Sequence, residues 1–316
     1  MILITGGLGY LGSRITKDLI SRGESVRIAT SRVEALNNDL GSDDSSESYE
    51  ITHLDLNDIN SINRACRGIQ SIIHLAAMDA SSSAENPNEA LKINAGGTLN
   101  LLNTAKRQNV RNFIYLSTVH VYGYPLEGTL TEEKNPQPIH HYSISHRVAE
   151  DYVLQSHSLG DLKGLVFRLT NAVGSPSKKS CSSWKLVVND LCKQIVISNK
   201  MLIHSCPNTQ RDFVPISDVC SVLYESLMNN EVFGKIYNLS SGSCHTLKNI
   251  AEIIKDRASN VLGVKPDIEF VETESNDNIN LVVSNKKILN AGFKLKLDIS
   301  SEIDKLLSNS NKWFGK

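Results

Sequence analysis

The chain has 316 residues with 33 basic and 34 acidic side chains, and its formal net charge is −1. A charge this close to zero gives no electrostatic basis for binding nucleic acid or an anionic membrane surface. No apolar run reaches the length of about 18 residues that a membrane span needs. The first ten residues are predicted to be a strand and a loop rather than a signal peptide, so we expect a cytoplasmic protein. Six scattered cysteines without a C-x-x-C pair fit reduced thiols, and they predict neither disulfides nor a metal site.

The chain opens with a short apolar strand that runs directly into a glycine-rich turn. Gly7, Gly9 and Gly12 match the pattern G-x-G-x-x-G, and a helix is predicted from about Tyr10 to Ser21. Glycines let the backbone turn sharply and approach a pyrophosphate closely, while the positive N-terminus of the helix faces the phosphates. The turn therefore predicts a dinucleotide site that includes Gly6, Gly9, Tyr10, Leu11 and Gly12.

Strand and helix patterns alternate through the first half of the chain, which predicts a parallel sheet with helices on both faces. The further predicted strands are residues 25–30, 49–54, 71–75, 112–117 and 164–169. The predicted helices are residues 57–66, 88–108 and 142–158. We expect the acidic segment 41–50 to be a solvated loop, and the segment 125–138, with its three prolines, to be irregular.

Several motifs follow the glycine turn in a fixed order. They are H-L-A-A at 74–77, N-A-G-G-T at 94–98, L-S-T-V-H-V-Y-G at 116–123, Y-S-I-S-H at 142–146, R-L-T-N at 168–171, R-D-F-V-P at 211–215 and Y-N-L at 237–239. Together they resemble the extended short-chain dehydrogenase/reductase family, specifically its nucleotide-sugar epimerases, dehydratases and reductases. The resemblance covers nearly the whole chain.

The resemblance implies an α/β fold with a Rossmann-type doubly wound parallel sheet and a smaller C-terminal substrate-binding lobe. We expect residues 1–171 to form the dinucleotide-binding domain, with strand and helix returns near 203–230. Residues 172–202 and 231–316 are expected to form the substrate lobe. By the same resemblance, the helices near 88–108 and 142–158 pair across the interface of a homodimer.

In such enzymes a tyrosine moves the hydroxyl proton while hydride passes to or from nicotinamide, and the resemblance assigns this role to Tyr142. It also assigns to Thr118 a hydrogen bond to the reacting oxygen. A phenol has a pKa of about 10, so work near neutrality needs a positive charge or oriented dipoles nearby. The family normally supplies a lysine four residues after the tyrosine, where this chain has His146.

His146 leaves two interpretations open. Imidazole hydrogen-bonds a ribose hydroxyl when neutral, but it is charged only below about pH 6.5 unless its surroundings shift it. The neighbouring Arg147 is predicted to point about 100° away around the helix. The chain is then either an active enzyme with weak or pH-dependent activation of Tyr142, or a protein that retains the cofactor and turns over poorly.

The residues after Thr118 bear on the type of reaction. The family's hexose dehydratases have an acid–base pair of Asp and Glu there, and this chain has Val119 and His120. Valine transfers no proton, so 4,6-dehydratase chemistry is not expected. His120 is a candidate base for epimerisation or a side chain that lines the sugar pocket.

The end of the second predicted strand favours NADP(H), with NAD(H) as the alternative. NAD-selective sites place a carboxylate there to bind the ribose 2′-hydroxyl, whereas this chain has Thr30, Ser31 and Arg32, which suit a 2′-phosphate. The resemblance places further residues around the cofactor. They are Asp55, Leu56, Leu75, Ala76, Ala77, Asn94, Ser117, Tyr142 and His146.

On the substrate side, the resemblance implies that Asn171 and Arg211 hold a nucleoside diphosphate, while Thr118 and His120 contact the sugar. Asp218 is predicted to cap a helix that begins near Val219. The leading hypothesis is an NADPH-dependent reductase of a 4-keto nucleotide sugar. A nucleotide-sugar 4-epimerase with tightly bound NAD and a non-catalytic dinucleotide-binding protein are the alternatives. Neither the sugar nor the base (UDP, GDP, CDP or dTDP) is indicated by the sequence.

Overall fold

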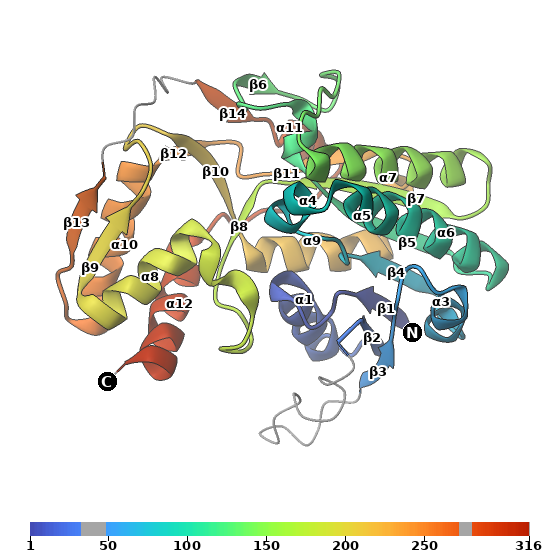
Figure 1. Ribbon diagram of the computed structural model, residues 1–316, viewed down its shortest axis with the longest axis horizontal. Helices are drawn as coiled ribbons and strands as arrows, with labels where there is room; N and C mark the ends of the chain where they lie inside the picture. Colours follow the sequence, from blue (N-terminus) through green and yellow to red (C-terminus); the bar gives the residue numbers. More distant parts are fainter. Residues whose placement is uncertain (33–48, 272–279, 316) are drawn as a thin grey trace. The chain divides into compact units, whose positions relative to one another are not determined.

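A computed structural model describes residues 1–32, 49–271 and 280–315 (Figure 1). Within these ranges no helix combines the length and the apolar character that a membrane crossing requires. Residues 41–48 of the predicted acidic loop lie outside the described residues. The chain divides into two compact units. The first comprises Met1–Tyr124, Lys134–Leu169 and Val222–Tyr237, and the second comprises Pro125–Glu133, Thr170–Ser221 and Asn238–Lys316.

The first unit is built on a seven-stranded sheet with the order β11-β7-β5-β4-β1-β2-β3. Its strands are β1 (Ile2–Thr5), β2 (Val26–Thr30), β3 (Tyr49–His53), β4 (Ser71–His74), β5 (Asn112–Thr118), β7 (Lys163–Leu169) and β11 (Ile236–Leu239). β1 pairs in parallel with β2 and β4, β3 pairs with β2, and β5 pairs with β4 and β7. The strands β2, β3, β4, β5 and β7 begin and end within one residue of the predicted bounds, and the predicted parallel sheet is confirmed. The edge strand β11 was not predicted, because residues 231–316 were expected to form the substrate lobe.

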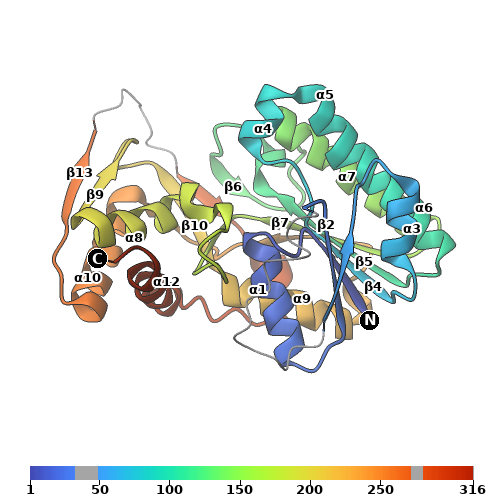
Figure 2. The same ribbon diagram turned by 60° about the horizontal axis from the view of Figure 1, so that its bottom comes forward.

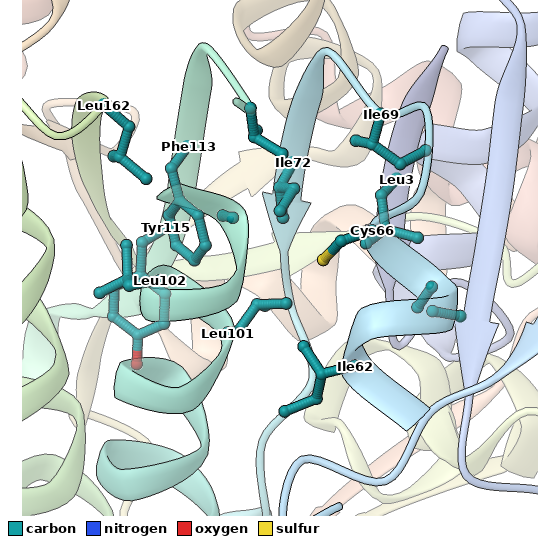
Figure 3. Close-up of a cluster of buried hydrophobic side chains, with 14 of the residues drawn as sticks. Leu3, Ile62, Cys66, Ile69, Ile72, Leu101, Leu102, Phe113, Tyr115 and Leu162 are labelled. Atoms are coloured by element: carbon teal, nitrogen blue, oxygen red, sulfur yellow. The ribbon is translucent and has the colours of Figure 1, made fainter. Parts of the chain in front are cut away.

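Helices cover both faces of this sheet (Figure 2). They are α1 (Tyr10–Ser21), α3 (Ile59–Cys66), α4 (Ala80–Glu85), α5 (Pro87–Ala90), α6 (Gly97–Arg107), α7 (His141–Ser158) and the end of α9 (Ile216–Met228). Side chains from α3, α6 and α7 form one buried cluster with the strands, which includes Leu3, Ile62, Leu101, Phe113 and Tyr115 (Figure 3). On the opposite face α1 contacts α9, where the Arg22 guanidinium lies 4.5 Å from the centre of the Tyr224 ring.

The predicted helix over 88–108 is not a continuous α-helix. Between α5 and α6, residues Leu91–Gly96 form a π-helix, in which one turn holds an extra residue. Gly97 then begins α6 close against Leu56, because a Cβ at this position would lie 2.7 Å from the Leu56 Cβ. The π-helix packs against α7. The proposed homodimer through these helices stays a prediction.

The second unit has its own core. Its strands are β6 (Gly128–Leu130), β8 (Asn171–Val173), β9 (Lys200–Ile203), β10 (Gln210–Pro215), β12 (Cys244–Thr246), β13 (Asp267–Phe270) and β14 (Leu281–Val283), and its helices are α8 (Val187–Ser198), α10 (Leu247–Leu262), α11 (Lys286–Asn290) and α12 (Ile299–Phe314). Apolar side chains of α8, α10 and α12 form the core together with strand residues such as Met201 and Phe213. That this unit binds substrate stays a prediction.

Two local predictions in this unit are wrong. The proline-rich segment 125–138 contains a short strand, β6, which pairs with β14. Asp218 does not cap a helix, because α9 already begins at Ile216. Its carboxylate instead accepts hydrogen bonds from the backbone amides of Lys296 and Leu297, at 3.0 and 2.8 Å. Leu297 has a positive φ of 55°, so Asp218 anchors a strained turn.

Candidate active site

The glycine turn after β1 contains glycines that differ in how strongly the fold requires them. Gly6 has a positive φ of 69°, and a Cβ at Gly12 would lie 2.3 Å from the Gly6 carbonyl oxygen. Gly12 is therefore required by packing. A Cβ at Gly9 would meet only that same oxygen, at 3.1 Å. Among the described residues, no side chain caps the N-terminus of α1 at Gly9.

A buried histidine joins this turn to the loop after β4. His74 Nε2 lies 3.0 Å from the Thr98 hydroxyl, which itself donates to the Asn94 carbonyl at 2.5 Å. His74 Nε2 must therefore carry the hydrogen, and Nδ1 accepts from the Thr5 hydroxyl at 2.6 Å. The Thr5 oxygen in turn accepts the backbone amides of the two residues that follow His74, both at 3.1 Å. Burial lowers the pKa of His74 to about 3, so this network holds a neutral imidazole.

Asn94, in the π-helix, connects the loop after β4 to α7. Its side-chain oxygen accepts the Met78 amide at 2.8 Å, and its amide group donates to the Ser145 hydroxyl at 3.0 Å. Ser145 donates to the Tyr142 carbonyl at 2.9 Å. The predicted cofactor residue Asn94 is thus buried and hydrogen-bonded through both ends of its side-chain amide, and it fixes the helical turn that carries Tyr142.

The structure brings the two predicted catalytic hydroxyls together. Tyr142, in the first turn of α7, is hydrogen-bonded to Thr118 at the end of β5. Burial raises the pKa of Tyr142 to about 12, against the effect of the Thr118 hydrogen bond, and Asp79 adds to the rise. No cation among the described residues acts on this pKa. At neutral pH the phenol is therefore protonated.

His146 lies directly beside this tyrosine. The two rings meet edge-on, with centroids 4.4 Å apart and planes at 61°. His146 Nδ1 lies 2.6 Å from the hydroxyl oxygen of Tyr115 on β5, and both residues are buried. Burial lowers the pKa of His146 to about 3, so the side chain adds no positive charge next to Tyr142.

The two nearest arginines of this region are held by carboxylates. Arg147 pairs with Glu150 and Asp151, as its predicted direction away from the site requires. Arg168 on β7 pairs with Glu150 at 2.8 Å, and both side chains are almost fully buried. Ser117, a predicted cofactor residue, donates its hydroxyl to Glu150 at 2.6 Å. Its side chain therefore belongs to the ion-pair network beneath the site.

The predicted adenosine end of the site lies at the ends of β2 and β3. Thr30 is buried and its hydroxyl accepts the Arg32 amide at 3.2 Å, while the side chains of Ser31 and Arg32 are exposed. Asp55 is exposed and accepts the Asn57 amide at 2.8 Å, and Leu56 is buried. Leu75 and Ala76 are partly buried and Ala77 is exposed, in the loop that the His74 network fixes.

The remaining predicted residues fall into both units. His120 follows Thr118 in a short 3₁₀ helix, Val119–Tyr122, and its amide donates to the Thr118 hydroxyl at 3.2 Å. Asn171 and Arg211 belong to the second unit, on the paired strands β8 and β10. Asn171 pairs with Phe213 in the sheet, and its side chain donates to the Asp212 carbonyl at 2.8 Å.

Tyr115 and Glu150 were missed as residues of the site. Tyr115 lies between Ile114 and Leu116 in a buried strand, so the sequence indicates only that it is an aromatic residue of the core. Glu150 lies eight residues after Tyr142, and a buried carboxylate on α7 requires a cationic partner. This requirement predicts an ion pair for Glu150, but it does not identify Arg168 as the partner.

Residues 2–240 match the model of the NAD dependent epimerase/dehydratase family. The chain belongs to this family. Among curated relatives, UDP-glucuronic acid decarboxylase 1 of Arabidopsis thaliana is 28% identical over 87% of this chain and 61% of the relative's length. A putative UDP-glucose 4-epimerase of Methanocaldococcus jannaschii is 24% identical over 99% and 100%. The GDP-6-deoxy-D-mannose reductase of Pseudomonas aeruginosa is 31% identical over 62% and 66%.

Solved structures agree on the fold. MoeE5 in complex with UDP-glucose and NAD superposes with a TM-score of 0.82 at 19% identity and covers 99% of both chains. The RMD structure from Pseudomonas aeruginosa with NADPH gives 0.75 at 22% identity, again over 99% of both chains. The fold of this chain is therefore the Rossmann-type fold of the epimerase/dehydratase family, as the sequence predicted.

The residues of the glycine turn fit the NAD(P) of the family. The absence of a side chain at Gly9 lets a pyrophosphate approach the backbone closely, and the N-terminus of α1, which no side chain caps among the described residues, presents backbone amides. At the other end of the site, His146 Nε2 is buried without a hydrogen-bond partner in the part of the chain that the structure describes. A buried nitrogen of this kind needs a partner, and a cofactor hydroxyl supplies one.

Proposed function

We propose that this chain catalyses NADPH-dependent reduction of a 4-keto nucleotide sugar, with Tyr142 as the proton donor. The protonated Tyr142 hydroxyl, on whose pKa no cation acts within the described residues, carries this proposal. Burial raises the pKa of Tyr142 to about 12, and the imidazole at its ring edge is neutral. Reduction of a ketone needs a proton donor, and a protonated phenol is one. Oxidation of an alcohol needs the phenolate, which this site disfavours.

When bound, the nicotinamide supplies hydride to the ketone carbon. Tyr142 gives its proton to the ketone oxygen, so the carbonyl becomes a secondary alcohol, and the tyrosinate regains a proton from solvent. The Thr118 hydroxyl, hydrogen-bonded to Tyr142, is placed to hold the same oxygen. Val119 beside it provides no acid or base, which is consistent with reduction and not with removal of water.

Two observations support NADPH over NADH. The end of β2 has no carboxylate at Thr30, and Ser31 and Arg32 are exposed next to it. A hydroxyl and a guanidinium both donate to a 2′-phosphate. The RMD structure, which contains NADPH, also favours this choice, whereas the MoeE5 structure contains NAD.

The second candidate is a UDP-hexose 4-epimerase that keeps NAD bound throughout its cycle. It is favoured by the relative named a putative UDP-glucose 4-epimerase, which the chain covers completely. Such an enzyme begins by oxidising the sugar, so it has to form the Tyr142 phenolate in a site without a neighbouring lysine. A non-catalytic dinucleotide-binding protein is the third candidate.

Purified protein incubated with NADPH and a panel of 4-keto UDP-, GDP-, CDP- and dTDP-sugars separates the three candidates. A reductase consumes NADPH and yields a sugar two mass units heavier, because one hydride and one proton are added. An epimerase interconverts UDP-glucose and UDP-galactose without net consumption of nicotinamide. Tyr142→Phe is expected to lower kcat by about 10²- to 10⁴-fold with NADPH binding retained. Binding without turnover of any sugar would contradict both enzymatic proposals.

A further inference from the structure

The two ring nitrogens of His146 have different surroundings. Nδ1 lies 2.6 Å from the Tyr115 hydroxyl, whereas Nε2 has no hydrogen-bond partner among the described residues. The exposed fractions of Tyr115 and His146 are only 2% and 3%. A polar atom buried at such a depth without a hydrogen-bond partner destabilises the folded state, so the site is incomplete without a group that binds Nε2.

The contacts of Tyr115 decide which nitrogen carries the hydrogen. A neutral imidazole has one N–H and one lone pair. Within the described ranges, His146 Nδ1 is the only acceptor bonded to the Tyr115 hydroxyl. If Nδ1 carried the hydrogen, both the Tyr115 O–H and the Nε2 lone pair would be left unsatisfied. If Tyr115 donates to Nδ1, only the Nε2 hydrogen lacks a partner. The second arrangement satisfies one more buried group.

Tyr115 is held firmly enough to impose this choice. Its ring lies in the buried cluster beside Leu102 and Phe113 (Figure 3). On its other side it packs on His74, with ring centroids 5.6 Å apart. His74 is itself fixed through both nitrogens by Thr5 and Thr98. Thr5 ends the strand that leads into the glycine turn, so one set of contacts connects that turn to His146.

We propose that Tyr115 is a positioning residue that fixes His146 as the Nε2–H tautomer and thereby aims one uncharged donor at a hydroxyl of the cofactor's nicotinamide ribose. The proposal deepens the proposed function, because it rests on use of the dinucleotide site beside Tyr142. A lysine at this position would present a charge and three donors. The Tyr115–His146 pair presents a single donor in one direction and adds no charge to the site.

The other titratable groups near the pair do not form a hydrogen bond with Nε2 in the described part of the chain. Tyr142 faces His146 from the same helix, and His74 faces Tyr115 from β4. Glu150, one helical turn further on, is occupied by Ser117 and Arg168. Asp79 acts on Tyr142, and its carboxylate caps α4 by accepting the Ser82 amide.

The test compares two ligands in the Tyr115→Phe protein. NADPH contains the nicotinamide ribose, and adenosine 2′,5′-bisphosphate lacks it. Loss of the Tyr115 hydroxyl is expected to weaken NADPH binding by about fivefold to twentyfold, as loss of one buried hydrogen bond does, and to leave binding of the bisphosphate unchanged. In a His146→Gln background the same substitution is expected to have no further effect on NADPH. Equal weakening of both ligands would show a merely structural role and overturn the proposal.

A second measurement tests the tautomer without any variant of Tyr115. Nitrogen NMR of protein labelled at histidine reports which ring nitrogen is protonated, and His146→Gln identifies the signal of His146. We expect an Nε2–H signal that persists from pH 8 to pH 5; an Nδ1–H or a charged ring would overturn the assignment. Neither measurement needs turnover. Failure of the reductase proposal with a persistent Nε2–H signal would leave the role of Tyr115 intact.

Discussion

His146 lies edge-on against Tyr142 at a centroid distance of 4.4 Å, and it is neutral. The resemblance to the family predicts a lysine at this position, where this chain has an uncharged ring. The histidine is built into the core, because Tyr115 binds the ring from the adjacent strand. The presence of histidine instead of lysine affects the protonation of Tyr142 most directly.

His146→Lys is expected to raise the rate of alcohol oxidation at neutral pH by about tenfold or more, because an adjacent cation lowers a pKa by about one to three units. The rate of ketone reduction at pH 7 is expected to change much less, since both forms of the enzyme still hold a protonated Tyr142 there. Rates in both directions from pH 6 to pH 10 check this. Gln155→Lys, an exposed substitution on the same helix, serves as the control. Unchanged oxidation in a folded variant would contradict the electrostatic explanation.

Thr118→Val is expected to reduce kcat by about tenfold to a hundredfold, because the reacting oxygen loses a hydrogen bond and the Tyr142 hydroxyl loses its partner. Thr118→Ser keeps the hydroxyl and is expected to retain most of the activity. Thermal unfolding of both variants measures the stability that is lost with the hydrogen bond to the His120 amide, so that this loss is separated from the effect on kcat. If serine and valine behave alike, the hydroxyl has no part in the reaction.

Glycine substitutions are expected to separate folding from cofactor binding. Gly12→Ala places a Cβ 2.3 Å from the Gly6 oxygen and is expected to destabilise the fold. Gly9→Ala meets that oxygen only at 3.1 Å, so the protein is expected to fold while its affinity for NADPH falls. Urea unfolding and NADPH titration of the two variants check the difference. Normal affinity in Gly9→Ala would place the pyrophosphate elsewhere.

Acid is expected to destabilise the protein through its buried histidines. The pKa values of His74 and His146 are about 3 in the folded chain against about 6.5 when unfolded. Above pH 7 neither state is protonated, so their contribution is constant; as the pH falls from 6.5 toward 3, only the unfolded chain takes up these protons. His146→Gln should therefore reduce the pH slope of the unfolding free energy by up to about 1.4 kcal/mol per pH unit.

Arg32→Ala is expected to reduce the preference for NADPH over NADH by about tenfold, because a charge-assisted hydrogen bond to the 2′-phosphate contributes about 1.5–3 kcal/mol. Binding of NADH is expected to be unaffected. Titration of both cofactors against wild type and variant gives the ratio directly. Arg14→Ala, in the middle of α1, is a matched control for loss of one positive charge.

The sequence predicted most of the sheet because strands such as β1, β4 and β5 are short apolar runs that polar or glycine-rich residues terminate. It did not predict the edge strand β11. It did not predict the π-helix at Leu91–Gly96, since the residues of a π-turn do not differ in pattern from those of an α-helix. It also placed Asp218 at a helix start, whereas the carboxylate binds amides 78 and 79 residues away. The catalytic hydroxyls were predicted from motifs; their roles stay predictions. The Tyr115–His146 bond spans 31 residues and depends on packing that no local pattern encodes.

The bonds of Thr5 and His74 have a consequence for the thermodynamics of cofactor binding. They hold the turn after β1 and the loop after β4 in place through protein groups alone. A ligand that enters does not have to order these backbone segments, so little conformational entropy is lost there on association. Calorimetry is thus expected to show a smaller entropic penalty for this protein than for its Thr5→Val variant, in which the two amides and the imidazole lose their common partner.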